Sequence, residues 1–128
     1  MLNAVEGALQ AMGALYLITP FQLMNNVSFT SNQTQTFTAW GAGGVASGAR
    51  AIMFGYFFSA SVTGVSHQFA PHGSTLGQYF NLGNIQVASA FFNGFGICPL
   101  DAVAGKIDVK SSGGASSSSN MWIYGYYM

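Results

Sequence analysis

The first part of the chain has a hydrophobic pattern that favours a helix. Its apolar residues recur at spacings of three and four positions, as in the seam of a coiled coil, at Leu2, Val5, Leu9, Met12 and Tyr16. Pro20 follows, and the residue before a proline avoids the α region. The pattern predicts a helical arm over residues 1–20, packed either on its own domain or, through these five side chains, on a partner surface.

From residue 21 onward the hydrophobic period changes to two, which is typical of β-strands. Glycine, asparagine and proline residues separate the apolar runs at the spacing of an all-β sandwich. Asn93-Gly94 reads as a hairpin turn, and the serine-rich segment 111–120 as a flexible tip. The expected strands are 27–29 paired with 36–40, then 50–60, 65–70, 76–82, 85–92, 95–100, 106–111 and 121–128. We therefore predict an antiparallel, jelly-roll-like β-sandwich over residues 21–128.

Two of the expected strands are apolar on both faces. Residues 52–58 and 121–128 contain large side chains and no charged position. A strand with one solvated face should show polar alternation, so both faces are expected to be covered. This predicts a homo-oligomer, for which we expect a trimer. The aromatic residues expected in the core or between chains are Trp40, Phe54, Tyr56, Phe58, Trp122, Tyr124 and Tyr126.

Charge is scarce along the whole chain. Three Lys or Arg and three Asp or Glu give six charged residues, or 5%, and a net charge of zero; an average soluble domain has about 25%. A net charge near zero removes the repulsion that keeps copies of a protein apart. Three basic residues cannot neutralise a run of phosphates, so no nucleic-acid partner is expected. The composition favours permanent contact with other protein.

A membrane segment is not expected either. Residues 7–24 carry no charged side chain, and that length raises the question of a transmembrane helix. The stretch nevertheless contains Gln10, Pro20 and Gln22, and no Lys or Arg flanks it to orient it. The start Met-Leu-Asn followed by Glu6 also lacks the basic character of a signal peptide.

The residues that could carry chemistry are few. His67 and His72 are the two imidazoles, and no G-x-S-x-G turn is present, so we expect no enzymatic activity. Two histidines are fewer than the three or four ligands of a metal site, and we expect no metal and no cofactor. The two histidines are expected at a strand end and in the loop that follows it, where each is solvated or hydrogen-bonded. Asp101 and Asp108 are expected to cap turns or pair with lysines, and Cys98, in an apolar run, to be a buried and inert thiol.

Four short segments share a pattern of turn and core residues: Val-Ala-Ser-Gly-Ala-Arg-Ala-Ile at 45–52, Cys-Pro-Leu-Asp at 98–101, Gly-Lys-Ile-Asp-Val at 105–109 and Trp-Ile-Tyr-Gly-Tyr-Tyr at 122–127. The pattern resembles that of small β-sandwich domains in tailed-phage virion proteins, including head decorations and tail-fibre heads. It covers residues 45–128, with a five-residue link from Asp101 to Gly105 where the family has a tight turn. The resemblance implies a structural or attachment role, with no catalytic residues.

Composition and resemblance together predict a bacteriophage virion structural protein. We expect it on the capsid surface rather than the tail, cementing the shell by packing against itself and the major capsid protein. The alternative is a receptor-binding fibre head or a carbohydrate-binding module, because Trp40, Trp122, Tyr124 and Tyr126 could stack on sugar rings of host glycans. A small membrane-associated protein is a third reading.

Overall fold

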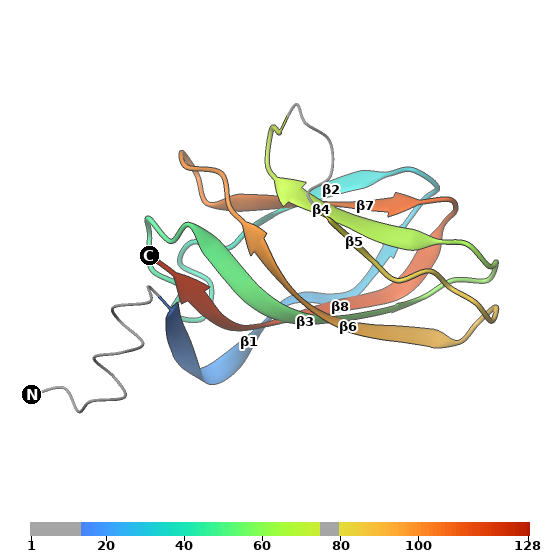
Figure 1. Ribbon diagram of the computed structural model, residues 1–128, viewed down its shortest axis with the longest axis horizontal. Coiled ribbons are helices and arrows are strands. Elements are labelled where there is room, and N and C mark those ends of the chain that lie inside the picture. Colours follow the sequence, from blue (N-terminus) through green and yellow to red (C-terminus); the bar gives the residue numbers. More distant parts are fainter. Residues whose placement is uncertain (1–13, 75–79) are drawn as a thin grey trace, which may run out of the picture.

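Alternating apolar residues give this chain a two-layered β structure. The computed structural model describes residues 14–74 and 80–128, within which there are eight strands and no helix. The strands are β1 Ala14–Phe29, β2 Thr34–Thr38, β3 Ala51–Ser59, β4 Ser66–Pro71, β5 Phe80–Leu82, β6 Phe91–Pro99, β7 Lys106–Ser112 and β8 Ser116–Tyr127. Sheet A has the order β1-β8-β3-β6 and sheet B the order β2-β7-β4-β5, with antiparallel pairing throughout. Figure 1 shows sheet B lying above sheet A, so the predicted antiparallel β-sandwich is confirmed.

The core lies between the two sheets and is built from alternate residues of the inner strands. In β3, Ile52, Phe54 and Phe58 are fully buried because the even-numbered side chains point toward sheet B. In sheet B, Ile107 and Val109 of β7 are buried in the same way. Each such side chain contributes about 1.5–3 kcal/mol by leaving water. The strands predicted over 50–60, 65–70 and 106–111 agree with β3, β4 and β7.

The predicted N-terminal helix is not supported. Residues 14–20 belong to β1, and Leu2, Val5, Leu9 and Met12 lie outside the described residues. Pro20 interrupts the strand only locally, because β1 is an edge strand whose register with β8 shifts between Tyr16 and Phe21. The residue before a proline prefers extended backbone, which fits a strand as well as a helix end. Within residues 14–74 and 80–128 no helix is long and apolar enough to cross a membrane.

The first predicted hairpin is wrong. β1, which includes 27–29, pairs with β8 in sheet A, whereas β2 pairs with β7 in sheet B. The polar turn between β1 and β2 therefore crosses from one layer to the other. In that turn the Thr30 backbone N–H donates to the Gln33 side chain at 2.9 Å. The sequence pattern located the turn, but it did not indicate that the two strands belong to different sheets.

The region from 83 to 99 also differs from the prediction. No strand covers 85–90; instead the Ile85 N–H and C=O bond to Val65 and Gly64, which anchors one buried side chain under the loop. Asn93 and Gly94 do not form a turn but lie inside β6, opposite Phe57 and Tyr56 of β3. Nine consecutive pairs with β3 outweigh the local turn preference of the Asn-Gly pair.

The serine-rich segment is not a flexible tip: Ser111 and Ser112 end β7, and only residues 113–115 lie between the strands. Residues 116–120 begin β8, which lies between β1 and β3 in sheet A. Ser116 and Ser119 are buried, and Ser119 is opposite Val27 of β1. Pairing on both sides of the strand overrides the weak strand preference of serine.

Candidate functional site

The two sheets differ completely in charge. The strands of sheet A contain no Asp, Glu, Lys, Arg or His. In sheet B, by contrast, β7 carries Lys106, Asp108 and Lys110, and β4 carries His67. The strands of sheet A therefore place no charged side chain on its outer face. A protein surface left in water rarely lacks charged groups.

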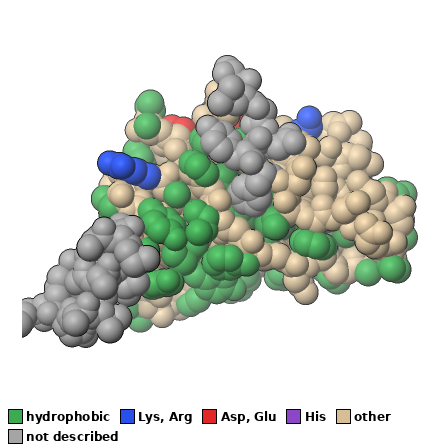
Figure 2. Space-filling model, in the orientation of Figure 1, with side chains coloured by type: hydrophobic (Ala, Val, Ile, Leu, Met, Phe, Trp, Pro, Cys, Tyr) green, Lys and Arg blue, Asp and Glu red, His purple; other side chains and the backbone are tan. Residues whose placement is uncertain are grey.

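That outer face exposes large apolar side chains. On β6, Phe91 is 57% exposed, Phe95 60% and Ile97 48%, because odd-numbered residues of this strand point away from sheet B. Tyr124 of β8 is 37% exposed, and Phe57 of β3 is half-buried between them. We call these five residues the aromatic face. Figure 2 shows hydrophobic side chains gathered over the part of the surface where β3 and β6 lie in Figure 1.

The rings of the aromatic face are held in place by one another. Phe57 and Phe91 meet edge to face with centroids 6.0 Å apart, and Phe95 stacks on Tyr124 at 6.3 Å. Tyr124 lies over Gly55, where a Cβ atom would come within 2.8 Å of its ring. A surface whose side chains are already ordered loses little entropy when a partner covers it.

Three of the aromatic residues predicted to lie in the core or between chains lie in the core. Phe54, Tyr56 and Phe58 are at most 2% exposed and face sheet B. Trp40 is half-buried, and its Nε1 donates to the Ala49 carbonyl at 2.9 Å. Phe54, Tyr56 and Phe58 therefore stabilise the fold of one chain and are not available to a partner, and the hydrogen bond of Trp40 ties its indole to the chain's own backbone.

The last strand does not alternate as a simple period of two predicts. Trp122 and Tyr124 are on the outer side, but a β-bulge between the pairs Phe54–Ile123 and Met53–Gly125 shifts the register by one residue. Tyr126 consequently turns inward and packs against the core. Of the predicted set, only Trp122 and Tyr124 reach the outer face of sheet A. Tyr16, the one described residue of the predicted arm contacts, is 60% exposed on β1.

Sequence reasoning missed Phe57, Phe91, Phe95 and Ile97. The sequence does contain a signal for this strand, which is the alternation of residues 91, 93, 95 and 97 with smaller or inward-facing residues. Reading Asn93-Gly94 as a turn divided that strand in two and hid the alternation.

A buried polar network links the two sheets. The Tyr56 hydroxyl of sheet A is 2.6 Å from Nδ1 of His67 in sheet B, and the Ser116 hydroxyl of sheet A is 2.7 Å from its Nε2. His67 also stacks on Phe58 with centroids 3.9 Å apart. Each hydroxyl can donate or accept, so the neutral ring is satisfied in either tautomer. Of the two states expected for His67, the hydrogen-bonded one is found: the ring lies inside β4 and solvent does not reach it.

Burial governs ionisation in this network. It lowers the pKa of His67 to about 3, because the charged imidazolium would lose its hydration. Burial also raises the pKa of the Tyr56 phenol, and the neighbouring Ser119 hydroxyl only partly opposes the rise. All the groups are uncharged at neutral pH. In this arrangement the network joins the sheets, and no substrate can reach it.

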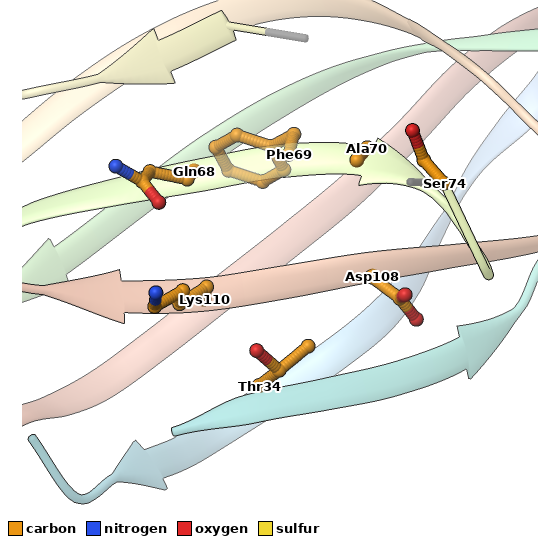
Figure 3. A pocket seen from close by; sticks show the side chains of 7 residues that line it. All are labelled: Thr34, Gln68, Phe69, Ala70, Ser74, Asp108 and Lys110. Atoms are coloured by element: carbon orange, nitrogen blue, oxygen red, sulfur yellow. The ribbon is translucent and has the colours of Figure 1, made fainter. Parts of the chain in front are cut away.

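The outer face of sheet B is polar. Asp108 accepts a hydrogen bond from the Thr36 hydroxyl at 2.6 Å and lies 2.8 Å from Nδ1 of His72. A shallow pocket of about 170 Å³ opens beside it, below the roughly 300–1,000 Å³ of typical ligand sites. Figure 3 shows its lining side chains on β2, β7 and β4 and in the turn after β4, namely Thr34, Gln68, Phe69, Ala70, Ser74, Asp108 and Lys110. Within the described ranges, no group of three or more His, Cys, Asp or Glu residues could hold a metal ion.

The prediction that Asp101 caps a turn is confirmed. Its carboxylate accepts hydrogen bonds from the backbone N–H groups of Val103, Ala104 and Lys106 at 3.0, 2.7 and 2.6 Å. Desolvation alone would raise the pKa of Asp101, but these three bonds favour the charged form and the net effect is a lowered pKa. Asp101 is thus committed to the link between β6 and β7.

Cys98 is buried and free, as predicted. Burial raises the pKa of its thiol to about 12, so almost none of the reactive thiolate exists at neutral pH. We expect no reaction of the native protein with a water-soluble aromatic disulfide reagent at mildly alkaline pH. One thiol per chain should react after unfolding in guanidinium chloride. Rapid labelling of the native protein would contradict this assignment.

Comparison with known proteins adds little to this description. No family model matches the sequence, and no curated protein matches it. Among solved structures, dimeric latent PorU from Porphyromonas gingivalis aligns with 89% of this chain at 11% identity and a TM-score of 0.44, and the chain spans only 13% of PorU. A carbohydrate binding module from Cellvibrio mixtus lichenase 5A, in complex with cellotriose, aligns over 86% of this chain and 98% of its own length, at 15% identity and a TM-score of 0.39. Neither likeness says what this chain does.

Proposed function

We propose that this protein is a non-catalytic assembly subunit that packs its aromatic face against copies of its own chain. The observation that carries the proposal is the contrast between the sheets. Sheet A has no charged strand residue and exposes Phe91, Phe95 and Ile97, while the charges of the described strands lie in sheet B. Such a division suits a molecule with one face against protein and the other in water.

The energetics of the aromatic face favour burial. Removing a large apolar side chain from water is worth about 1.5–3 kcal/mol, and Phe95 and Tyr124 are already stacked before any partner arrives. No charge on these strands has to be stripped of its hydration, so the usual cost of burying ionised groups is absent.

A second copy is a suitable partner because the chain has no net charge. Two identical faces without charge do not repel each other, which is the condition under which proteins self-associate. Over the nine-residue length of β3 and β6, the four strands of sheet A give a footprint of roughly 600 Å² at the usual strand spacings. A stable interface buries about 800 Å² per partner, so one face by itself lies at the lower limit.

The virion setting is part of the proposal. It is supported by the resemblance of residues 45–128 to phage decoration and fibre-head domains. Counting copies per particle by quantitative mass spectrometry tests it. Hundreds of copies would place the protein on the head and a handful would place it on the tail. A particle without any copy would rule out the virion setting.

The aromatic face can be tested by a double variant, Phe95→Ser with Tyr124→Ser. Losing about 1.4 kcal/mol at each of two central positions should weaken self-association about 100-fold. The measurement is sedimentation velocity of the full chain over a concentration series. Val103→Ser is the matched control, because Val103 is 90% exposed but lies in the β6–β7 link, away from the face. Equal association of both variants would contradict the proposed contact.

Glycan binding is the second candidate, supported by the exposed Phe95–Tyr124 pair on the same face. Trp40 and Tyr126 no longer support it, because both are packed into the chain's own structure. A glycan array probed with the wild type and the double variant separates the two functions. Specific glycan signals that disappear in the variant, from a protein that stays monomeric, would favour recognition of sugars over assembly.

A further inference from the structure

Each sheet of the sandwich has two edge strands, and three of the four edges are protected. Edge strands with free backbone groups tend to pair with other chains, and proteins usually shorten or distort them. In sheet B, β2 has five residues and β5 three. In sheet A, β1 contains Pro20 and has four register irregularities with β8. None of these strands offers a long regular edge.

The fourth edge, β6, has none of these protections. It is nine residues long, and its register with β3 is unbroken from Phe91 to Pro99. It contains no charged residue, and its proline is the last residue of the strand. Within the described part of the chain, β6 pairs with β3 alone. By the usual criteria this is an edge built for pairing.

The hydrogen bonds identify which backbone groups of β6 are free. The Leu100 N–H donates to the Arg50 carbonyl at 2.8 Å, and Pro99 has no N–H to donate. In an antiparallel pair, hydrogen-bonded and non-bonded positions alternate. The even-numbered residues of β6 therefore bond to β3. The N–H and C=O groups of the other residues point away from the sheet, at Phe91, Asn93, Phe95 and Ile97.

We infer that β6 pairs antiparallel with β6 of a second copy of this chain, joining two copies of sheet A into one continuous eight-stranded sheet. The inference rests on the proposed function and names the geometry of the assembly. A pair of identical strands has a twofold axis, so assembly would proceed by dimers rather than by the trimer predicted from the sequence.

One register uses every free backbone group. With Gly94 opposite Gly94 of the second copy, Phe91 faces Ile97 of that copy and Asn93 faces its Phe95. All four outward N–H groups then find a carbonyl, and all four carbonyls find an N–H. Moving the centre to Phe95 would place Phe91 opposite Pro99, which leaves the Phe91 carbonyl without a donor.

The pairing also enlarges the surface available for packing. The four residues whose backbone groups are free have their side chains on the outer face of sheet A. Pairing at this edge would therefore join the two aromatic faces into one. An eight-stranded sheet of this strand length has a footprint of roughly 1,100 Å². That exceeds the roughly 800 Å² per partner of a standard interface, whereas a single face does not reach it. Edge pairing therefore supplies the contact area that packing of a single face lacks.

A disulfide test reports the register directly. Two variants, Phe91→Cys and Ile97→Cys, are purified separately, mixed and oxidised. In the inferred register the two positions are about 5.5 Å apart between Cα atoms, within the range of a disulfide. Identical positions on the two copies would be about 20 Å apart, so neither variant should cross-link alone. We expect about tenfold more disulfide dimer in the mixture than in either single variant; equal yields would overturn the register.

Amide exchange of the wild-type chain tests the pairing without any substitution. The four outward amides, at Phe91, Asn93, Phe95 and Ile97, should exchange about 100-fold more slowly in the assembled protein than at high dilution. Face packing without edge pairing leaves them unbonded, and exchange at the dilute rate in an assembled sample would overturn the inference.

Asn93→Pro blocks the edge selectively. It removes one N–H group that points away from β3 and leaves every hydrogen bond to β3 in place. Pro99 already occupies a position of the same kind, on the side of β6 that faces away from β3. Asn93→Ala is its matched control, since it removes the side chain and keeps the N–H. We expect about 100-fold weaker self-association for Asn93→Pro and about threefold or less for Asn93→Ala. Equal values contradict edge pairing but not the proposed function; a wild-type chain that stays monomeric at micromolar concentration contradicts both.

Discussion

Acidification from about pH 6.5 to about pH 4.5 is expected to lower the free energy of unfolding by about 2–3 kcal/mol through His67 alone. The ring is fully buried between Phe58, Tyr56 and Ser116. Protonation would keep both hydrogen bonds, because either hydroxyl can accept, but it would place an uncompensated charge in the core. The strands of sheet A that face this ring bring no carboxylate to offset that charge.

The direction of this pH effect follows from the pKa of His67 in the unfolded chain and in the folded protein. In the unfolded chain a histidine binds its proton near pH 6.5, and in the folded protein His67 does so only near pH 3. Between these values the unfolded chain holds one more proton, so its population grows as the pH falls. The stabilisation is complete above about pH 6.5 and declines by about 1.4 kcal/mol for each pH unit below it.

Urea unfolding at several pH values measures how the free energy of unfolding changes with pH, and two variants show whether His67 causes the change. His67→Gln should be less stable at neutral pH, since glutamine fits the two hydroxyls less well, and its stability should hardly change from about pH 6.5 to about pH 5, above the carboxylate titrations. His72→Gln is the matched control, because it removes the other imidazole and leaves His67 in place, so the loss of stability assigned to His67 should remain. A flat wild-type profile over this interval would show that His67 is protonated in the folded state.

The strands that sequence predicted well are those whose patterns are strong and local. β3, β4 and β7 agree with prediction because apolar alternation and flanking turns coincide there. β6 was missed because Asn93-Gly94 is a strong local turn signal, and only its pairing with the distant β3 overrides it. The N-terminal helix failed for a related reason, since β1 is extended by its pairing with the C-terminal strand β8.

The candidate site was only partly predictable. Composition indicated correctly that charges are scarce, but their segregation into sheet B depends on which strands become neighbours. A strand apolar on both faces does not reveal which face is inward, so Phe54 and Phe58 could not be separated from Phe57 by pattern alone. The contact of His67 with Tyr56 and Ser116 joins β4 to the preceding strand β3 and to the distant strand β8, and no local motif predicts it.

Gly105→Ala is expected to destabilise the fold by about 3 kcal/mol or more. Gly105 has a φ of +64°, where an alanine costs about 1–2 kcal/mol. A Cβ atom there would also overlap the Trp40 indole, which its hydrogen bond to the Ala49 carbonyl prevents from moving freely. Overpacking of this kind costs a further 1–3 kcal/mol or so. The glycine lies at the end of the Asp101 turn, and its carbonyl accepts the Ala39 N–H at 2.9 Å.

Gly41→Ala separates the two contributions to this loss. Gly41 has a φ of +80°, and a Cβ atom added there would meet nothing within 4 Å, so it should show only the backbone cost of about 1–2 kcal/mol. Urea unfolding of both variants at neutral pH gives the comparison. If Gly105→Ala lost no more stability than Gly41→Ala, the indole would have to yield at little cost, and Trp40 would be free enough to serve as a contact residue after all. A clear excess for Gly105→Ala confirms Trp40 as a fixed part of the chain's own packing and leaves the outer face of sheet A as the surface available to partners.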